Sequence, residues 1–361
     1  MRNLKLKFSN EINPDFINLL RQNVKEYFEI NHLSKNANTS MVLKSIFMFS
    51  LYLAPYFLMI SGIITSSPLI FFMWIIMGLG MAGIGLAVMH DAAHRSYSKN
   101  QTINNLLAYS LNILGGSVVT WKYQHNILHH GYTNIDGYDE DINPGIIMRF
   151  DPNKPRYKMH RYQHIYGWII YGFMSLNWAI DKDFKQLIRY HKEGAVLSSN
   201  KSYNRLMFDL ILSKLFFYFF ILVIPLIVLP LPWWMVLINY LAMQFVCGLI
   251  LSVIFQTAHV VPSSRYFVPN KDGNIENNWA IHQLMTTSDY APKSKIFSWL
   301  IGGLNYQVEH HLFPNICHVH YHKIAGIVKE NAYRYKLPYN VKPNFFLAIA
   351  SHGKMLKNLG R

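Results

Sequence analysis

Cysteine is almost absent from this chain of 361 residues, in which Cys247 and Cys317 are the only two. Two cysteines cannot build the framework of several disulfides that stabilises small secreted domains, so that class of protein is excluded. A reducing compartment therefore suits the chain. Its length is sufficient for one large domain or two smaller ones.

Charged side chains are missing from two long stretches, residues 45–89 and 215–264. Each stretch is about twice the ~20 apolar residues that one bilayer-spanning helix requires. Each also contains a turn-forming break near its middle, "TSSP" at 65–68 and "LPLPWW" at 229–234. The pattern predicts two helical hairpins that supply four transmembrane helices, with Trp233 and Trp234 at a headgroup interface. Buried helix pairs of a soluble protein are the alternative.

Acidic residues are scarce as well: 19 Asp and Glu accompany 34 Lys and Arg, which gives a formal net charge of +15. The basic residues lie in the N-terminal arm, the middle segment and the C-terminal segment, whereas both hairpin turns are uncharged. The positive-inside tendency therefore places these three segments, and both termini, in the cytoplasm. Residues 1–40 are polar and lack the apolar core of a cleavable signal peptide.

These features predict an all-α integral membrane protein with a single domain. In chain order we expect a cytoplasmic amphipathic arm, a hairpin, a cytoplasmic segment, a second hairpin and a cytoplasmic C-terminal segment, over residues 1–40, 41–89, 90–206, 207–258 and 259–361. A helix beginning near Asn13–Pro14 is expected on the membrane or on the cytoplasmic body. Residues 164–178 are apolar but too short to span, so we expect a helix in the interface or under the soluble part.

Seven histidines form three clusters at the cytoplasmic ends of the predicted spans, namely "HDAAH" (His90, His94), "HNILHH" (His125, His129, His130) and "QVEHH" (His310, His311). Histidines four residues apart share one face of a helix, so two of them can bind one ion. Adjacent histidines diverge by about 100° on a helix and can serve two different ions. Together the clusters supply more imidazoles than a single tetrahedral ion needs.

Several motifs of other metal or nucleotide enzymes are absent or out of place. No HExxH sequence occurs, so a zincin-type protease has no support. Few carboxylates accompany the clusters, unlike the Glu plus Glu-x-x-His arrangement of soluble di-iron bundles. The segment "GLGMAG" at 78–83 matches a nucleotide-binding fingerprint, but it lies inside the second predicted span and is better explained by helix packing. A redox metal suits imidazole ligands, although spacing alone does not choose among iron, copper and zinc.

The clusters HxxxH, HxxxHH and QxxHH, in this order around two hairpins, resemble those of the membrane fatty acid desaturase family. The third cluster, with Gln307 in "QVEHHLFP", resembles that of front-end and related acyl-lipid or acyl-CoA desaturases. The similarity extends from about His90 to His322. It implies an oxidoreductase with a non-haem centre of two iron ions, which uses O₂ and two electrons to introduce a double bond into a fatty acyl chain.

Carried over by position, the resemblance implies eight metal ligands: His90, His94, His125, His129, His130, His259, His310 and His311. Of these, His259 lies outside the three clusters, in "TAHVV" at the end of the fourth predicted span. Gln307 is implied as a weak ligand, a water-mediated ligand or a group that orients His310. Asp91 and Glu309 adjoin implied ligands and could accept hydrogen bonds from their free imidazole N–H groups.

Two further polar stretches are expected to lie away from the ligands. In "HVHYH" at 318–322, the alternating histidines are expected in an extended or surface segment. The acidic run "DGYDED" at 136–141 is expected to form a solvated loop, with a role behind the ligands as its alternative.

Many front-end desaturases carry a fused cytochrome b5 domain marked by His-Pro-Gly-Gly, which this sequence lacks. The resemblance then implies a separate electron donor, a ferredoxin or a free cytochrome b5, with the fatty acyl substrate and the bilayer as other partners and no nucleic acid. The topology suits a bacterial inner membrane. A hydroxylase, ketolase or sphingolipid desaturase with the same clusters is the nearest alternative. A metal transporter is a more remote one, because transporter ligands lie near the bilayer midplane.

Overall fold

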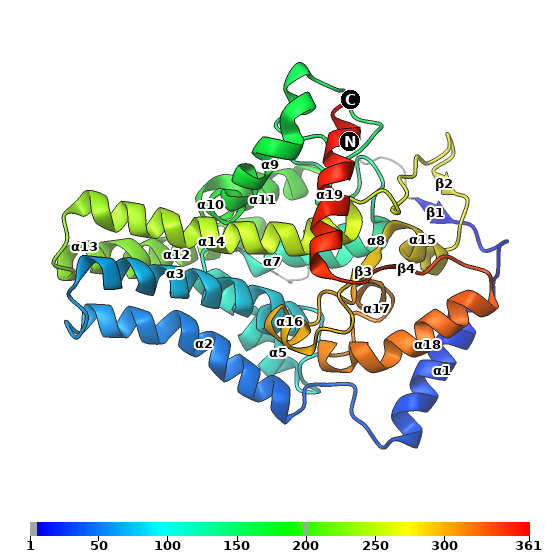
Figure 1. Cartoon of the computed structure of the whole chain (residues 1–361), viewed down its shortest axis with the longest axis horizontal. Coiled ribbons are helices and arrows are strands. Elements are labelled where there is room, and N and C mark those ends of the chain that lie inside the picture. Colours follow the sequence, from blue (N-terminus) through cyan, green and yellow to red (C-terminus); the bar gives the residue numbers. More distant parts are fainter. Residues whose placement is uncertain (1–5, 196, 198–200) are drawn as a thin grey trace.

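Four long helices form one half of the molecule in the computed structural model, which describes residues 6–195, 197 and 201–361 (Figure 1). The first hairpin consists of α2 (Thr39–Ile60) and a continuous helix made of α3 (Ser67–Gly83), the π-helical turn η1 (Ile84–Met89) and α4 (His90–Ala93). The second consists of α12 (Tyr203–Tyr218), η5 (Phe219–Val223) and α13 (Ile224–Val228), followed by α14 (Trp233–His259). All four are long and apolar enough to cross a membrane, as predicted.

Both hairpin turns lie at one end of the bundle, and we call the opposite end, where the rest of the chain gathers, the site end (Figure 1). Small residues bring the central helices close together. A Cβ atom on Gly78 of α3 would lie 2.7 Å from the carbonyl oxygen of Met243 in α14, and one on Gly80 would lie 2.5 Å from the backbone nitrogen of Tyr52 in α2. The glycine-rich segment 78–83 is therefore a helix-packing surface, as expected from its place in the span.

Two π-helical turns lie at the first two histidine clusters. The turn η1 ends next to His90, and η2 (Tyr123–His129) carries His125 and His129 between α7 (Val118–Lys122) and α8 (His130–Tyr132). A π-turn widens the helix locally and changes the direction in which nearby side chains project, and such turns are frequent at functional sites. The four-residue spacing of the clusters is thus combined with a locally adjusted backbone.

The apolar segment between the hairpins packs against α14 and also contacts α19 (Phe345–Leu359). It forms α9 (Gln163–Gly172), α10 (Met174–Asn177) and η4 (Trp178–Lys182), followed by α11 (Asp183–Lys192). The hydroxyl of Ser252 donates to the carbonyl of Tyr171 over 3.3 Å, and that of Ser175 donates to the carbonyl of Gln244 over 2.7 Å. Because Gln244 is fifteen residues from the end of α14 at 1.5 Å per residue, this segment reaches about 22 Å along the span.

The N-terminal arm lies on the body of the protein. Its helix α1 (Phe16–Ile30) begins two residues after the predicted Asn13–Pro14 start and packs on α18 (Tyr321–Arg334). The buried face of α1 presents Phe16, Leu20 and Val24 to this contact, which matches the spacing of its apolar residues.

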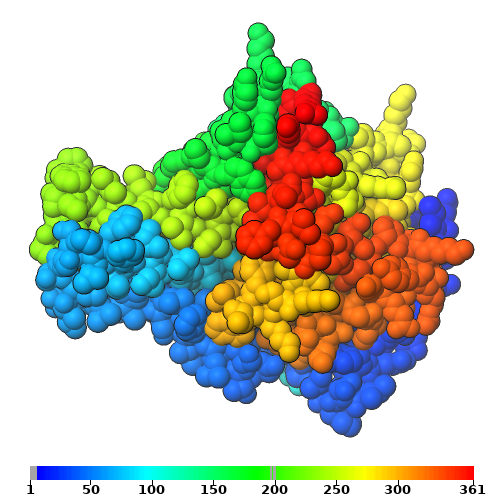
Figure 2. All heavy atoms as spheres, in the orientation of Figure 1, coloured from blue at the N-terminus to red at the C-terminus, as the bar shows by residue number. Residues whose placement is uncertain are grey.

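The remaining elements form a helical cap over the site end. They are α5 (Gln101–Ala108), α6 (Ser110–Ile113), η3 (Lys158–Tyr162), α15 (Trp279–Thr286), α16 (Lys295–Leu300), α17 (Gln307–Leu312), η6 (His318–His320) and α19 (Phe345–Leu359). Two parallel strand pairs interrupt this helical cap, β1 (Lys7–Phe8) with β2 (Asn274–Ile275) and β3 (Ser288–Tyr290) with β4 (Asn340–Lys342). Figure 2 shows α19 lying across the junction between the spans and the cap.

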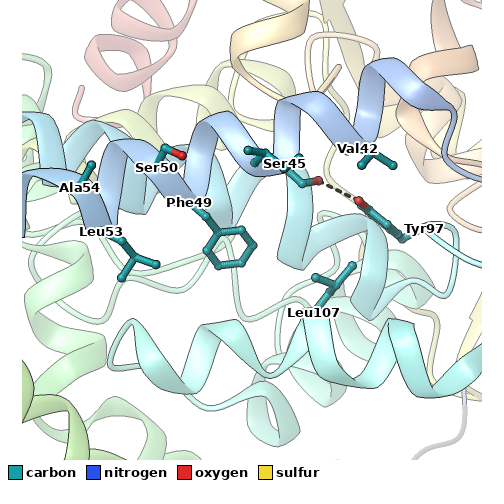
Figure 3. Close-up of a pocket in the computed structure, with 9 residues that line it drawn as sticks. Val42, Ser45, Phe49, Ser50, Leu53, Ala54, Tyr97 and Leu107 are labelled. Atoms are coloured by element: carbon teal, nitrogen blue, oxygen red, sulfur yellow. Dashed lines mark hydrogen bonds between the residues drawn. The ribbon is translucent and has the colours of Figure 1, made fainter. Parts of the chain in front are cut away.

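A surface groove follows α2 on the outside of the bundle (Figure 3). Its lining is apolar along most of its length and includes Phe49, Leu53 and Leu107. At one end the hydroxyls of Ser45 and Tyr97 form a hydrogen bond of 3.0 Å. The groove thus runs along a helix that is long and apolar enough to cross a membrane.

Candidate metal centre

Imidazoles from four separate elements converge at the site end in two groups. The first group contains His90, His94, His125 and His310, and the second contains His129, His259 and His311. Within each group the nitrogen atoms lie within 4.8 Å of one another, and every one of these side chains is buried. Each group therefore offers enough imidazoles to bind one metal ion.

His130 lies between the two groups. Its ring centroid is 4.8 Å from that of His94 in the first group and 4.4 Å from that of His311 in the second. Its Nε2 atom is 3.3 Å from Nε2 of His125. The structure thus brings together all eight histidines that the sequence nominated, including His259 at the end of α14.

Hydrogen bonds behind the rings fix the orientation of four of these histidines. Nδ1 of His129 lies 3.1 Å from the carboxylate of Asp139, and Nδ1 of His311 lies 2.8 Å from Oε1 of Gln283. Nδ1 of His259 lies 3.3 Å from the carbonyl oxygen of Thr286. Nδ1 of His310 lies 3.2 Å from the hydroxyl of Tyr321. Carboxylate, amide and backbone oxygens only accept, so the first three Nδ1 atoms carry the proton and donate it. Their Nε2 lone pairs are then free to bind a metal ion.

Those Nε2 atoms meet no hydrogen-bond partner in the described part of the chain. This holds for Nε2 of His94, His129, His259, His310 and His311, all of which are buried. Buried polar atoms are normally hydrogen-bonded, so several unsatisfied nitrogens directed at one place require another explanation. Metal ligation supplies it, because each atom presents the lone pair that a cation accepts, and the residues present fit a metal centre.

Burial sets the protonation state that ligation needs. Desolvation, reinforced by the neighbouring imidazoles, holds the pKa values of His94, His125, His130, His310 and His311 well below the usual value for histidine. These rings are therefore neutral at physiological pH, the form that binds metals. His129 differs: burial would lower its pKa, but Asp139 and Asp141 outweigh burial and raise it.

Comparison with known proteins identifies the family. The profile of the family described as "Fatty acid desaturase" matches residues 66–343. The chain belongs to the fatty acid desaturase family. It is 34% identical to an acyl-lipid (8-3)-desaturase of Physcomitrium patens over 98% of this chain and 74% of the relative. It is 33% identical to an sn-1 linoleoyl-lipid 6-desaturase of Arthrospira platensis (94% and 91%), and 30% identical to the Delta(5) fatty acid desaturase A of Dictyostelium discoideum (96% and 75%).

Membership in the desaturase family makes the chain an oxidoreductase that desaturates fatty acids, and the four apolar helices make it a membrane protein. The resemblance drawn from the histidine clusters is confirmed. The clusters that indicated the family are the same residues that the fold gathers into the two groups.

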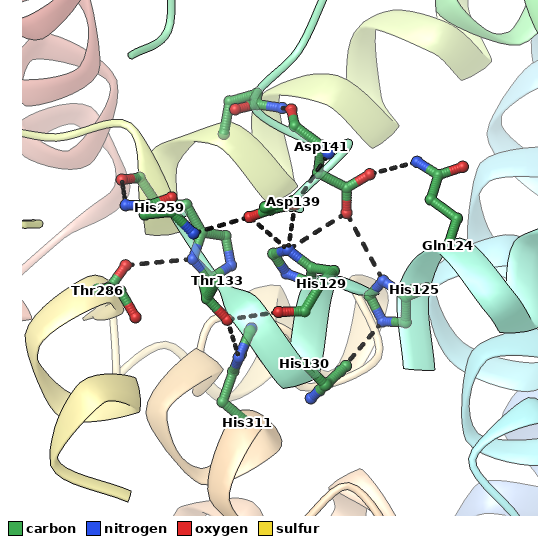
Figure 4. A network of polar contacts seen from close by, with 12 residues as sticks. Gln124, His125, His129, His130, Thr133, Asp139, Asp141, His259, Thr286 and His311 are labelled. Carbon is green, nitrogen blue, oxygen red and sulfur yellow. Dashed lines mark hydrogen bonds and ion pairs between the residues drawn. The ribbon is translucent and has the colours of Figure 1, made fainter. Parts of the chain in front are cut away.

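In the acidic run after the second cluster, the expectation of a solvated loop was wrong for Asp139, whereas Gly137 is exposed and the other residues are partly exposed. Asp139 is only 2% exposed, and it accepts hydrogen bonds from the backbone nitrogens of Asn134 and Asp141 at 2.9 Å each. Figure 4 shows His129 beside the carboxylates of Asp139 and Asp141, with His125 on the other side of Asp141. These two backbone N–H groups hold the carboxylate of Asp139 in place, and the carboxylate orients the imidazole of His129. Such a role behind the histidines was the alternative considered for this run.

Replacing Asp139 with asparagine is expected to weaken metal binding by about 10- to 100-fold, because the imidazole of His129 loses its charged acceptor. The measurement is a titration of metal-free desaturase with Co²⁺ against a chelator of known affinity. Asp136→Asn is the matched control, since Asp136 lies in the same run but pairs with Lys154 at 2.7 Å. Equal Co²⁺ affinity of Asp139→Asn and wild type would contradict the assigned role.

Two residues that support the ligands carried no recognisable signal in the sequence. Gln283 of α15 accepts from His311, and its amide also donates to the carbonyl of His130 over 3.2 Å. The hydroxyl of Thr133 bridges this network. It donates over 2.6 Å to the carbonyl of His129 (Figure 4). It also contacts Oε1 of Gln283 at 2.9 Å. Both are ordinary polar residues that only the tertiary structure brings to the site.

Gln307 and Glu309, the two other polar residues of the third cluster, have different surroundings. The amide nitrogen of Gln307 donates to the carbonyl of Leu304 over 2.8 Å, while its buried Oε1 has no hydrogen-bond partner in the described chain. Glu309 does not accept from a ligand imidazole as considered above. It accepts from the hydroxyl of Tyr339 over 2.9 Å, and the same hydroxyl lies 2.7 Å from Asp289. Burial, together with the charge of Asp289, raises the pKa of Glu309 well above its usual range.

Asp91 contacts the "HVHYH" segment, which is not at the surface. His318 and His320 are 4% and 7% exposed and form a 3₁₀ turn, whereas His322 is exposed. The expectation of a surface segment was therefore wrong for the first two. Nδ1 of His318 lies 2.8 Å from Asp91, and Nε2 lies 2.6 Å from Nζ of Lys44. We call this chain of contacts the Lys44–His318–Asp91 bridge.

The bridge is not a third metal site, although Asp91, Cys317 and His318 come within ligand distance of one another. The ammonium group of Lys44 can only donate, so Nε2 of His318 accepts and Nδ1 carries the proton that is donated to Asp91. Both nitrogens of His318 are thus occupied. A cation there would also lie against the positive charge of Lys44. Asp91 reaches the ligand His90 only at 3.9 Å, which is too long for a hydrogen bond.

Proposed function

We propose that the protein is a front-end acyl-lipid desaturase in which the eight gathered histidines hold two iron ions. The two groups of buried imidazoles with unsatisfied Nε2 atoms are the observation that supports a pair of ions. Relatives named as acyl-lipid (8-3)-desaturase and linoleoyl-lipid 6-desaturase support an acyl chain on a membrane lipid that already carries a double bond. The new double bond would lie between the existing one and the carboxyl end.

The chemistry requires a metal because an unactivated methylene has no acidic proton that a side chain could remove. Two iron ions held by the eight histidines would supply the O₂-dependent oxidising chemistry that breaking such a C–H bond requires. Conversion of –CH₂–CH₂– to –CH=CH– with reduction of one O₂ to two water molecules consumes two further electrons and two protons. A separate ferredoxin or cytochrome b5 would supply those electrons. The protein's own residues hold neutral imidazole lone pairs in place and exclude bulk water from the reacting carbon.

An apolar pocket of about 30 Å³ lies next to His90, with room for about one methylene, so we propose that it receives the part of the acyl chain that reacts. It lies between the spans and the cap, where Met81, Leu111, Leu251 and Phe255 line its walls together with the edge of His90. An acyl chain in this pocket would be surrounded by hydrocarbon and would present one carbon to the first group of histidines. The walls come from α3, α6 and α14, so the spanning helices position the chain relative to the metals.

Filling this pocket is expected to impair long acyl chains without loss of metal. Gly85 lines the pocket, and a Cβ there would meet Leu251 at an ordinary 3.5 Å, so Gly85→Ala is a tolerated control. Gly85→Leu should lower conversion by about tenfold or more, because extra methylenes in a filled space cost ~1–3 kcal/mol. Lipid mass spectrometry and metal analysis of the purified variants provide the measurement. An unchanged rate and chain-length profile in the leucine variant would contradict the pocket assignment.

The proposed orientation places both termini, the cap and the metal site in the cytoplasm. The uncharged hairpin turns and the basic arm, middle and C-terminal segments support it. A bacterial inner membrane fits this arrangement. The two histidine groups lie at the ends of the spans rather than midway along them, which also favours an enzyme over a transporter.

The proposed activity is tested by expression with a panel of lipids that carry acyl chains of defined length and unsaturation. Mass spectrometry that locates double bonds should find a new one on the carboxyl side of an existing one, and purified protein should contain two iron ions per chain. A product that incorporates labelled oxygen from ¹⁸O₂ would show hydroxylation. Unaltered lipids in all cultures, with an active electron donor present, would refute the proposal.

A further inference from the structure

A basic groove lies near the start of α9, away from the metal centre. Arg156, Lys158, Arg161 and Arg361 line it, together with the rings of Tyr157 and Tyr162. The side chains of residues 156–159, 161 and 162 are exposed. Among the ion pairs of the described chain, none involves Arg156, Lys158 or Arg161, whereas the nearby Lys154 is paired with Asp136. The groove therefore presents uncompensated positive charge.

An exposed apolar stripe continues from this groove along α9. Tyr162, Ile165, Ile169 and Phe173 are 46% to 62% exposed and recur at intervals of three and four residues, which places them on one face. The opposite face of α9 is buried, with Gly167 packed against Met148. Basic residues at one end of an exposed apolar helix face are typical of a segment that contacts a lipid bilayer.

The position of α9 along the length of α14 agrees with a contact between this helix and the bilayer. Its far end lies beside the middle of α14, through the contacts of Tyr171 and Ser175 described above. Its first residue, Gln163, donates to the carbonyl of Leu356 in α19 over 2.8 Å. In turn, His352 of α19 donates to the carbonyl of Val260, the residue that ends α14. The start of α9 is thus near the end of the span, where headgroups lie, and the stripe extends into the hydrocarbon.

We infer that this groove binds the phosphate of an anionic phospholipid headgroup while the stripe contacts the acyl chains of the surrounding leaflet. Three guanidinium groups and one ammonium group line the groove and match the oxygens of a phosphodiester, since arginine donates in a planar fork. An acidic electron-donor protein would also be attracted to positive charge. The adjoining apolar stripe favours the lipid, because a soluble donor gains nothing from hydrocarbon-facing side chains at this depth. The inference is independent of the proposed acyl substrate.

The test uses purified full-length protein and native mass spectrometry to count lipids retained from micelles of dioleoylphosphatidylglycerol or dioleoylphosphatidylcholine. Wild type should retain phosphatidylglycerol about tenfold better. The variant Arg156→Gln/Lys158→Gln/Arg161→Gln should lose this preference, and Arg161→Gln alone should lose part of it. A matched control removes three exposed cations of α18, Lys323→Gln/Lys329→Gln/Arg334→Gln, and should behave as wild type.

Two further experiments test whether the groove binds free phosphate or an electron-donor protein instead of a lipid. Inorganic phosphate at equal concentration should not displace the retained phosphatidylglycerol, and displacement would indicate a site for free phosphate. Electron transfer from a ferredoxin or cytochrome b5 should be unchanged in the groove variant, and its loss with an intact lipid preference would assign the groove to the donor. Equal retention of both lipids by wild type, or an unaltered preference in the triple variant, would also overturn the inference.

Discussion

Replacing His311 with alanine is expected to abolish desaturation and to remove at least one of the two metal ions. His311 belongs to the group with His129 and His259, and its Nδ1 is fixed by Gln283 so that Nε2 faces the other imidazoles. Loss of one ligand from a three-histidine group leaves an ion with too few protein ligands for tight binding. Metal analysis of the purified protein and mass spectrometry of membrane lipids provide the two measurements.

His322→Ala is the matched control, because His322 follows the same cluster in the sequence but is exposed and lies in neither group. It should retain both metal and product. Folding of the His311 variant is checked by its thermal unfolding with metal removed, compared with metal-free wild type. A folded His311→Ala protein that keeps two ions and full activity would remove this residue from the centre.

Replacing Lys44 with methionine is expected to destabilise the protein by about 1–3 kcal/mol, the cost of leaving a buried hydrogen-bonding group without its partner. Lys44 is 2% exposed within α2, and its ammonium group is balanced by Asp91 through His318. Methionine fills a similar volume but leaves Nε2 of His318 buried without the donor that Lys44 supplies. The measurement is thermal unfolding in detergent, with Lys44→Arg retaining more stability because it keeps the charge and a donor.

Lys25→Met serves as the control for loss of a lysine, because the Lys25 side chain is 74% exposed and its contact with Glu29 is a surface pair. It should unfold at nearly the wild-type temperature. A Lys44→Met variant that unfolds together with this control would show that the Lys44–His318–Asp91 bridge contributes little to stability.

The spans and the gathering of the histidines could be predicted because both patterns are encoded locally. An uncharged apolar run of sufficient length predicts a membrane helix without knowledge of its neighbours, and a four-residue spacing places His125 and His129 on one side of a turn. The convergence of three such clusters followed from their common position at the span ends. Even His259, outside the clusters, could be nominated because it ends the fourth span.

The residues that orient the ligands could not be predicted, because they are defined only by the tertiary structure. Gln283 meets His311 and Tyr321 meets His310 through the packing of the cap, and neither has a distinctive sequence context. His318 appeared to be a surface residue because its partner Lys44 is 274 residues away, on another helix. The depth of α9 was missed for the same reason, since its length alone does not show which span it follows.

The two histidine groups differ in the hydrogen bonds that hold their rings from behind, at the Nδ1 atoms. In the second group, Nδ1 of each ring has an oxygen acceptor within 3.3 Å. In the first group, Nδ1 of His310 lies 3.2 Å from the hydroxyl of Tyr321. Nδ1 of His90, however, has no hydrogen-bond partner among the described residues, and Nδ1 of His125 lies 3.8 Å from Asp141. Less firmly held rings reorganise more easily, so a chelator should extract the two ions in sequence, the one beside His90 first. With the proposed pair of ions bound, partial depletion should then yield an inactive form with one ion, held between the cap and α14.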